Sequence, residues 1–220
     1  MVERAVRKRE TRQRIAETAL GLFARRGFDA VTVAEVAAAA GVTEKTVFNH
    51  FRSKEELVYS EDATFQAALL DAVGRRPPRE PALAAARAFF LQRYERVRID
   101  PAGRRRAVVL AELVAGSPAL RAREREIHAR YADALAALIA TEQDAPPEDM
   151  RPRLAAEAIV AVHRETVAAV RRALLAQAPD EEVAARAARV AREGFALLAG
   201  GLARYAGKPR ERAGAAVKAI

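Results

Sequence analysis

Apolar residues recur at intervals of three and four along almost the whole chain, and this spacing limits the fold more than any other feature. Such intervals place apolar side chains on one face of an α-helix, whereas a β-strand needs alternation at every second residue. No alternating stretch of Val, Ile and Thr of useful length occurs. Alanine, leucine, arginine and glutamate, which favour helices, dominate the composition. The sequence therefore predicts an all-α fold.

Helix caps and helix breakers divide this pattern into about nine helices. Two capping boxes, Thr32 with Glu35 and Ser53 with Glu56, predict the starts of the second and fourth helices. Gly27 and Gly41 predict the ends of the first and second. The expected helices cover about 6–26, 33–40, 44–51, 54–73, 81–98, 104–114, 118–141, 152–176 and 180–205.

The segment 74–81 contains three prolines and marks a boundary between two parts of the chain. We expect an N-terminal domain over residues 1–60, with the fourth helix running on to about residue 73 as a connection. A second helical domain then covers about residues 81–205. Residues 206–220 form a basic tail.

The charge balance favours a polyanionic partner. The chain has 38 Lys and Arg against 29 Asp and Glu, a net charge of +9, with local peaks at both ends. It contains no cysteine, which removes disulfides and cysteine-ligated metals. Every long apolar stretch is broken by charges, so no membrane-spanning helix is expected. The basic N-terminus has no apolar core behind it and is no secretory signal, which makes the cytoplasm the expected location.

The most informative stretch is the sequence TVAEVAAAAGVTEKTVFNHF, residues 32–51. A short helix, a glycine turn and a second short helix have the spacing of a helix–turn–helix. Small alanines allow the two helices to cross closely, and Gly41 takes the turn conformation without a Cβ. The second helix then exposes short polar side chains with one cation, which suit base edges and phosphates in a major groove. The alternative for this stretch is a helical hairpin without a DNA partner.

The flanking residues make the DNA-binding interpretation specific. Residues 11–60 resemble the DNA-binding domain of TetR-type transcriptional regulators. The resemblance rests on residues at fixed spacings: Arg14, Ile15, Leu20, Phe23, Gly27, Phe28, Thr32, Val33, Val36, Ala37, Gly41, Val42, Thr43, Thr46, Val47, Phe48, Asn49, His50, Phe51, Lys54, Glu55, Glu56 and Leu57. It implies three or four DNA-binding helices, followed by a divergent domain for ligand binding and dimerisation. The implied DNA contacts are Thr32, Thr43, Lys45, Thr46, Phe48, Asn49, His50 and Lys54.

This chain departs from the family pattern within the recognition helix. Phe48 stands where the family most often has Tyr, whose hydroxyl meets a phosphate, so Phe48 either packs on sugar or a thymine methyl or belongs to the core. Asn49 can read adenine through two hydrogen bonds. His50 matches the usual His of the family, which donates a hydrogen bond to a phosphate. The alternative is a histidine that caps its own helix and contacts no DNA. Thr46 and Asn49 are expected to read bases, and Lys45 and Lys54 to hold phosphates.

The second domain resembles the family only in its pattern of helices. Polar and aromatic residues on its otherwise apolar helices are candidate ligand contacts, with Met150 as further apolar lining: Phe89, Phe90, Tyr94, Glu112, His128, Tyr131, His163 and Thr166. We expect a mostly apolar pocket for a lipophilic effector, neutral or anionic rather than cationic. In the family the last two helices form the dimer interface; here the candidate residues are Val162, Val170, Leu174, Val190 and Leu197. These apolar residues can equally pack within the hydrophobic core of the single chain.

No catalytic constellation is visible. The three histidines show no metal-ligand spacing, and no phosphate-binding glycine loop or nucleophile motif occurs. We therefore expect no enzyme, no metal and no cofactor. The sequence predicts a homodimeric repressor that binds a near-palindromic operator and responds to a ligand. The alternative is a basic helical module that binds a membrane surface or another protein without specific DNA binding.

Overall fold

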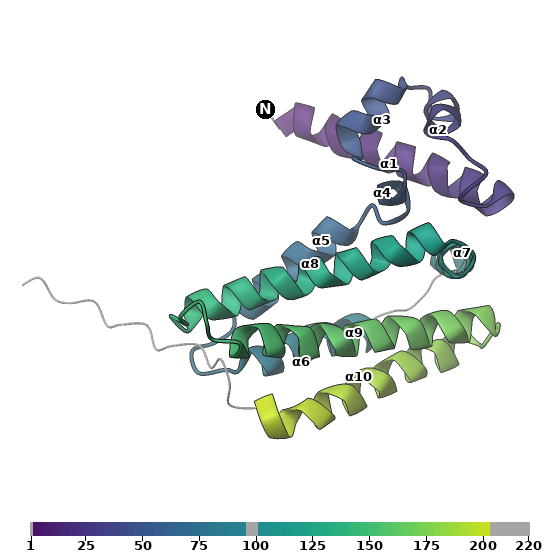
Figure 1. Cartoon of the computed structure of the whole chain (residues 1–220). Coiled ribbons are helices and arrows are strands. Elements are labelled where there is room, and N and C mark those ends of the chain that lie inside the picture. The colour runs from purple at the N-terminus through teal and green to yellow at the C-terminus, as the bar shows by residue number, and fades with distance from the viewer. Residues whose placement is uncertain (1, 96–100, 203–220) are drawn as a thin grey trace, which may run out of the picture. The chain divides into compact units, whose positions relative to one another are not determined.

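The computed structural model describes residues 2–95 and 101–202, and every regular element in these ranges is a helix (Figure 1). Within them the chain forms ten helices: α1 (Val2–Arg26), α2 (Val33–Ala39), α3 (Glu44–His50), α4 (Glu55–Val58), α5 (Asp62–Gly74), α6 (Ala82–Glu95), α7 (Pro101–Gly116), α8 (Pro118–Glu142), α9 (Arg151–Leu175) and α10 (Asp180–Leu202). The all-α prediction is confirmed.

The expected single helix from Ser53 to about Val73 was wrong, because the structure divides it into α4 and α5. The capping box predicted at Ser53 does not form: Glu56 accepts a 2.8 Å hydrogen bond from the N–H of Arg52 instead, and the N-cap residue of α4 makes no side-chain cap. Tyr59 then leaves helical geometry, and its hydroxyl donates to Leu120 O at 3.0 Å. A tertiary contact therefore breaks a helix that local signals predicted to be continuous.

Other predicted helix ends agree more closely. Gly27 and Gly41 have φ angles of 82° and 66°, the left-handed conformation that glycine adopts without strain. Helix α7 begins at Pro101, so Gly103, which was expected in a break, lies inside the helix. Proline is well suited to a first helical position because its missing N–H would have no partner there. The predicted end of the last helix near residue 205 and the basic tail 206–220 lie outside the described residues.

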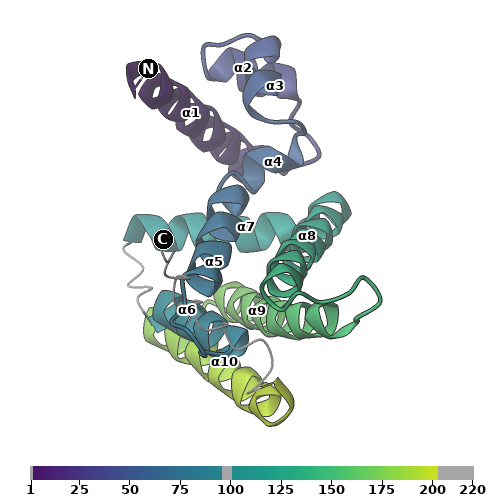
Figure 2. The ribbon, with the colours of Figure 1, turned by 90° about the vertical axis from the view of Figure 1, so that its left-hand side faces the viewer.

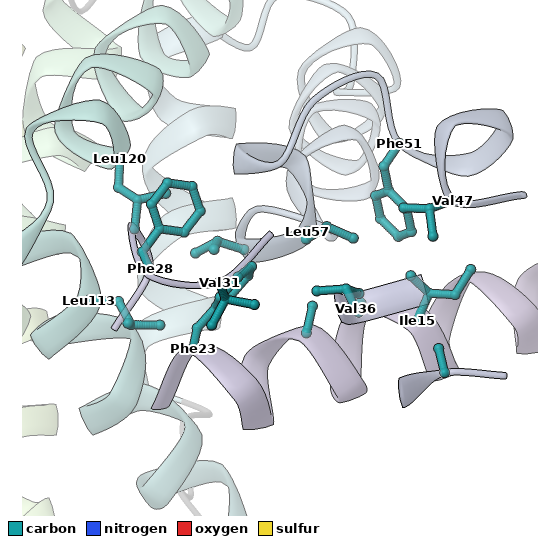
Figure 3. Close-up of a cluster of buried hydrophobic side chains, with 14 of the residues drawn as sticks. Ile15, Phe23, Phe28, Val31, Val36, Val47, Phe51, Leu57, Leu113 and Leu120 are labelled. Carbon is teal, nitrogen blue, oxygen red and sulfur yellow. The ribbon is translucent and has the colours of Figure 1, made fainter. Parts of the chain in front are cut away.

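The internal contacts divide the chain into two compact units. The first comprises residues 1–65, 99–127 and 174–178, and its core draws on α1–α4, α7 and the start of α8. Figure 3 shows Phe23 and Phe28 beside Leu113 and Leu120 at one end of this core. The packed side chains fix the short helices α2, α3 and α4, which are too short to be stable alone.

Among the described residues, the second unit comprises 66–95, 128–173 and 179–202. Helices α6, α9 and α10 lie side by side in it (Figures 1 and 2). Gly194 of α10 faces Val162 of α9 so closely that a Cβ at position 194 would lie 2.8 Å from Val162 Cγ1. Phe90 of α6 and Phe195 of α10 are buried, with ring centroids 5.9 Å apart.

Two searches of the described residues bear on other kinds of function. No helix among them has the length and hydropathy needed to cross a membrane. The same residues contain no group of three or more His, Asp or Glu side chains placed to hold a metal ion.

Candidate nucleic-acid interface

Side chains at the start of α2 and α3 fix the turn between the two helices. Thr32 and Glu35 form the predicted capping box: Glu35 N donates to Thr32 Oγ1 at 3.2 Å, and Thr32 N donates to Glu35 Oε2 at 2.8 Å. Thr43 caps α3, accepting a 3.1 Å hydrogen bond from Thr46 N. With Gly41 in the left-handed conformation between them, the two helices form a helix–turn–helix.

The α2 cap remains ionised at every physiological pH. The backbone N–H of Thr32 and the guanidinium of Arg26 together lower the pKa of Glu35 to about 2. Arg26 Nη1 lies 2.6 Å from Glu35 Oε1. The Glu35 carboxylate therefore stays charged throughout the physiological pH range, and the cap that it forms at the start of α2 persists over that range.

Helix α3 has one buried side and one exposed side. Val47 and the following Phe51 are each 1% exposed and enter the core of the first unit (Figure 3). Lys45, Phe48 and Asn49 are exposed on the other side, Phe48 to 51%. Phe48 is therefore not a core residue. The helix presents an ammonium group, an amide and an apolar ring to solvent.

The remaining predicted DNA contacts lie on or next to this helix. Thr32 and Thr43 are exposed, whereas Thr46, His50 and Lys54 are half-buried. The hydroxyls of Thr43 and Thr46 are 2.9 Å apart and share a hydrogen bond, so each is already oriented by the other. The structure thus gathers six of the eight predicted residues on α3 and its cap, with Thr32 at the start of α2 and Lys54 just before α4.

His50 is held in its neutral form. Burial lowers its pKa, and the positive charges of Lys8 and Arg12 lower it further. Its Nδ1 is buried and has no hydrogen-bond partner among the described residues. These surroundings favour the neutral imidazole over the imidazolium.

Lys54 is engaged with the core. Its Nζ lies 4.3 Å from the centroid of the Phe28 ring and 5.8 Å from that of Phe23. An ammonium over aromatic faces contributes about 0.5–2 kcal/mol. Replacing Lys54 would therefore disturb packing as well as any phosphate contact, which makes Lys45 the cleaner residue for testing phosphate binding.

Arg12, near the N-terminus, was not among the residues that the sequence predicted for this interface, yet it contacts the end of α3. Its guanidinium donates to the carbonyl of His50, the last residue of α3, and to Ser60 O at 3.3 Å. It also lies 4.0 Å from the centroid of the Phe51 ring. A signal was present in the spacing, since Arg12 is three residues before the buried Ile15 and so lies near the apolar face of α1. Arg12 fixes the C-terminal end of α3.

Five of the predicted ligand contacts meet in the second unit. Tyr94 Oη and His163 Nδ1 are 2.6 Å apart, and the ring of Phe90 stacks 5.0 Å from that of His163. His128 meets His163 edge-on at 5.5 Å, and the Tyr131 ring lies 6.3 Å from His163. All five side chains are buried. The structure therefore assembles a compact aromatic and polar cluster from α6, α8 and α9.

The other predicted ligand contacts lie differently. Thr166 is buried, but its hydroxyl donates to Val162 O of its own helix at 2.8 Å. Phe89 is half-buried, with its ring 5.3 Å from that of Phe90. Glu112 is exposed on α7 in the first unit, and Met150 is exposed before α9. A polar residue on an apolar helix therefore did not by itself identify an interior position.

Buried His163 makes folding stability depend on pH. Burial, with smaller contributions from the nearby charges of His128 and Arg93, lowers its pKa from 6.5 to about 3. Between these values the unfolded chain binds a proton that the folded chain does not, so stability falls as the pH falls below 6.5, by at most about 1.4 kcal/mol per pH unit.

We expect wild type to lose about 2 kcal/mol more between pH 7 and pH 5 than His163→Gln, which has no group to protonate there. Urea denaturation of both proteins at both pH values checks this. The carboxylates are the same in both chains, so they cancel in the comparison. Parallel pH profiles would show that His163 is not the group responsible.

Helices α9 and α10 leave an apolar groove on the surface of the second unit. The groove has a volume of about 430 Å³ and is lined in part by Val162, Val190 and Leu197. Leu197 is 84% exposed, which is unusual for a leucine. Val170 and the buried Leu174 do not line this groove. Three of the five predicted dimer residues thus line one apolar groove, in which Leu197 is exposed, Val190 half-buried and Val162 buried.

A helix–turn–helix whose second helix presents polar side chains defines a class of DNA-binding protein. The profile of the family described as "Bacterial regulatory proteins, tetR family" matches residues 15–59. The "HTH-type transcriptional regulator TcmR" of Streptomyces glaucescens is 32% identical over 163 residues, which are 71% of each chain. The chain belongs to the TetR family of transcriptional regulators.

Further comparisons agree over most of the chain. The "Putative mycofactocin biosynthesis transcriptional regulator MftR" of Mycobacterium tuberculosis is 28% identical over 159 residues, 71% of this chain and 77% of the relative. Among solved structures, a SmeT–triclosan complex superposes with a TM-score of 0.54 at 19% identity, covering 92% of this chain and 96% of that one. The structure of FadR of Bacillus subtilis in complex with stearoyl-CoA superposes with a TM-score of 0.51 at 19% identity, covering 83% of this chain and 97% of that one. At these identities the likeness establishes the fold.

Proposed function

We propose that this regulator is a repressor that binds a near-palindromic operator as a homodimer and leaves it when a small lipophilic molecule binds. The observation that supports it most directly is the exposed side of α3, where Lys45, Phe48 and Asn49 are held outward by the buried Val47 and Phe51. Its site of action is the cytoplasm, where bacterial DNA lies. The named relatives are regulators, and we assign the chain no catalytic activity.

Within the interface, we assign sequence reading to side chains that carry no charge. The amide of Asn49 fits the N6 and N7 edge of adenine, and the ring of Phe48 fits a thymine methyl or a sugar. The hydroxyl of Thr46, oriented by Thr43, adds a further contact. Lys45 neutralises a phosphate, and Thr32, His50 and Lys54 position the backbone around the groove.

Asn49→Ala is expected to weaken binding to the selected operator by roughly 1–3 kcal/mol and to relax the preference at one position in each half-site. Lys45→Ala is the matched comparison, because both residues are exposed on the same helix. It should weaken binding to every sequence alike and reduce the slope of log K against log salt concentration by about one unit.

Selection of bound fragments from random duplex DNA supplies the operator, and fluorescence anisotropy on operator and random duplexes then measures both variants. If Asn49→Ala loses the same affinity for both duplexes, Asn49 does not read a base. If wild type selects no sequence, the repressor proposal fails altogether.

The dimer follows from the groove and from the geometry of DNA. Two-fold pairing places two recognition helices in successive major grooves, about 34 Å apart, and so requires a surface that complements itself. The apolar groove of α9 and α10 with the exposed Leu197 is such a surface, and we place the interface there.

The ligand site is proposed at the aromatic and polar cluster of the second unit. Phe90 and Tyr131 supply apolar lining, and Tyr94, His128 and His163 supply polar groups that can exchange partners with a ligand. Two structures of the same fold hold triclosan and stearoyl-CoA, of which the first is a chlorinated aromatic molecule and the second carries a long apolar acyl chain. The cluster contains no carboxylate that would attract a cation, so a neutral lipophilic molecule or a lipophilic acid is the expected class.

A thermal-shift screen of lipophilic acids, lipophilic neutral molecules and lipophilic cations tests this assignment. A true effector weakens operator binding by the same factor by which operator weakens effector binding. Tyr94→Phe should lower the affinity for the effector more than the affinity for the operator. If only cations stabilise the protein and release it from DNA, the assigned ligand class is wrong.

A further inference from the structure

The first unit contains a polar cavity beside α1, and none of the residues that line it is one of the predicted DNA contacts. It has a volume of about 310 Å³ and lies between α1, the segment 60–64 and α7. Three arginines line it, Arg9 and Arg12 from α1 and Arg106 from α7. Gln13, Ser60 and Thr64 add hydrogen-bonding groups. The volume is at the lower end of the range for small-molecule sites.

The charges around this cavity do not pair across it. Glu17 lines it too, but accepts a 2.9 Å hydrogen bond from Gln13 Nε2. The structure gives no side-chain hydrogen bond or ion pair among the described residues for Arg9, Arg106 or Glu61, although all three line the same space. Three guanidinium groups therefore surround a space that two carboxylates, those of Glu17 and Glu61, also line, and an excess of positive charge remains.

A second polar cavity of the chain shows the contrasting arrangement. It has a volume of about 360 Å³ and is lined by Asp71, Arg75 and Arg76 among others. There Arg75 pairs with Asp71 at 2.6 Å, and Arg76 pairs with Glu142 at 2.7 Å. Both arginines of this second cavity thus have an acidic partner. Arg9 and Arg106 of the first cavity have none among the described residues.

We propose that the cavity of Arg9, Arg12 and Arg106 binds a small anion that carries carboxylate or phosphate groups and a hydroxyl or amine. Guanidinium groups bind carboxylate and phosphate oxygens through paired, charge-assisted hydrogen bonds. Glu61 accepts from the hydroxyl or amine, which selects against a simple inorganic anion. Arg12 already holds His50 O and Ser60 O and lies at the inner wall, while Arg9 and Arg106 are exposed and approach the anion from two helices. This site is separate from the lipophilic site proposed in the second unit.

Differential scanning calorimetry of the full chain tests the proposal, with citrate and sulfate at 10 mM against chloride of equal ionic strength. Citrate supplies carboxylates with a hydroxyl, and sulfate supplies an anion that has no hydroxyl. For a Kd of about 1 mM, citrate should raise Tm by roughly 3–5 °C, and sulfate by less. The double variant Arg9→Gln/Arg106→Gln should lose this response, which separates a site from the general stabilising effect of these salts.

Arg105→Gln is the matched control, because Arg105 is exposed on α7 next to Arg106 but does not line the cavity. It should keep the full response. The proposal is overturned if wild type and the double variant respond alike, or if Arg105→Gln loses as much as the double variant. It is also overturned if the double variant, without added anion, binds all duplex DNA more weakly, because the arginines then hold DNA phosphates. A wild type that responds to citrate but selects no operator would defeat the repressor proposal and leave this site standing.

Discussion

Leu197→Glu is expected to convert the proposed homodimer into monomers, with a self-association constant weakened by about 100-fold or more. A two-fold interface contains each residue twice, and each buried leucine contributes about 1.5–3 kcal/mol. The substitution also brings two carboxylates into an apolar surface, where an unpaired charge is strongly unfavourable. Since both half-sites must be engaged together, affinity for the full operator should fall by about 10²–10⁴-fold while affinity for an isolated half-site stays the same.

Sedimentation velocity and anisotropy on full and half operators measure the two effects. Ala199→Glu is the matched control: it puts the same charge at another exposed position of α10, outside the groove lining. It should remain dimeric and bind normally. Wild type that is monomeric at micromolar concentration and still binds the full operator tightly would refute the proposed interface.

Arg76→Ala is expected to lower the free energy of unfolding by about 3–5 kcal/mol, the usual effect of removing one partner of a buried ion pair. Arg76 is 3% exposed, although it lies in the connection between α5 and α6. Its Nη2 lies 2.7 Å from Glu142 Oε2, and its Nε and Nη1 donate to Glu80 O at 2.8 Å and Val73 O at 2.6 Å. The substitution leaves one carboxylate and two carbonyls without this partner.

Arg75→Ala, at the neighbouring position, is the control. The Arg75 side chain is 82% exposed and forms a surface ion pair with Asp71, so its loss should change stability by less than about 0.5 kcal/mol. Urea denaturation at one fixed protein concentration compares the two variants, because the stability of a dimer depends on concentration. Equal effects of the two substitutions would mean that the contacts of Arg76 do not stabilise the fold.

The parts of the site that local chemistry determines could be predicted from the sequence. The caps at Thr32 and Thr43 and the turn at Gly41 depend on residues within three or four positions, and the structure has all of them. The buried side of α3 followed from spacing alone, since Val47 and Phe51 are four residues apart on one helix face.

Features that depend on distant residues could not be predicted in this way. The break between α4 and α5 involves the hydrogen bond from Tyr59 to Leu120, 61 positions along the chain. Arg76 was assigned to a linker because three prolines follow it closely, yet its partner Glu142 lies at the end of α8. Arg12 reaches the end of α3, 38 positions away. Such pairings carry no periodic signal, and charged residues are expected at the surface by default.

Within the seven residues of α3, the side chains that hold the helix in the fold differ from those that we assign to recognition of DNA. Val47 and the cap at Thr43 and Thr46 hold the helix in place, whereas Lys45, Phe48 and Asn49 form no side-chain hydrogen bond or ion pair among the described residues. Substitutions at such exposed positions usually change stability by less than about 0.5 kcal/mol. Substitutions at these three positions are therefore expected to leave the fold intact, so that, if they read the operator as proposed, a duplicated copy of the gene can acquire a different operator one residue at a time.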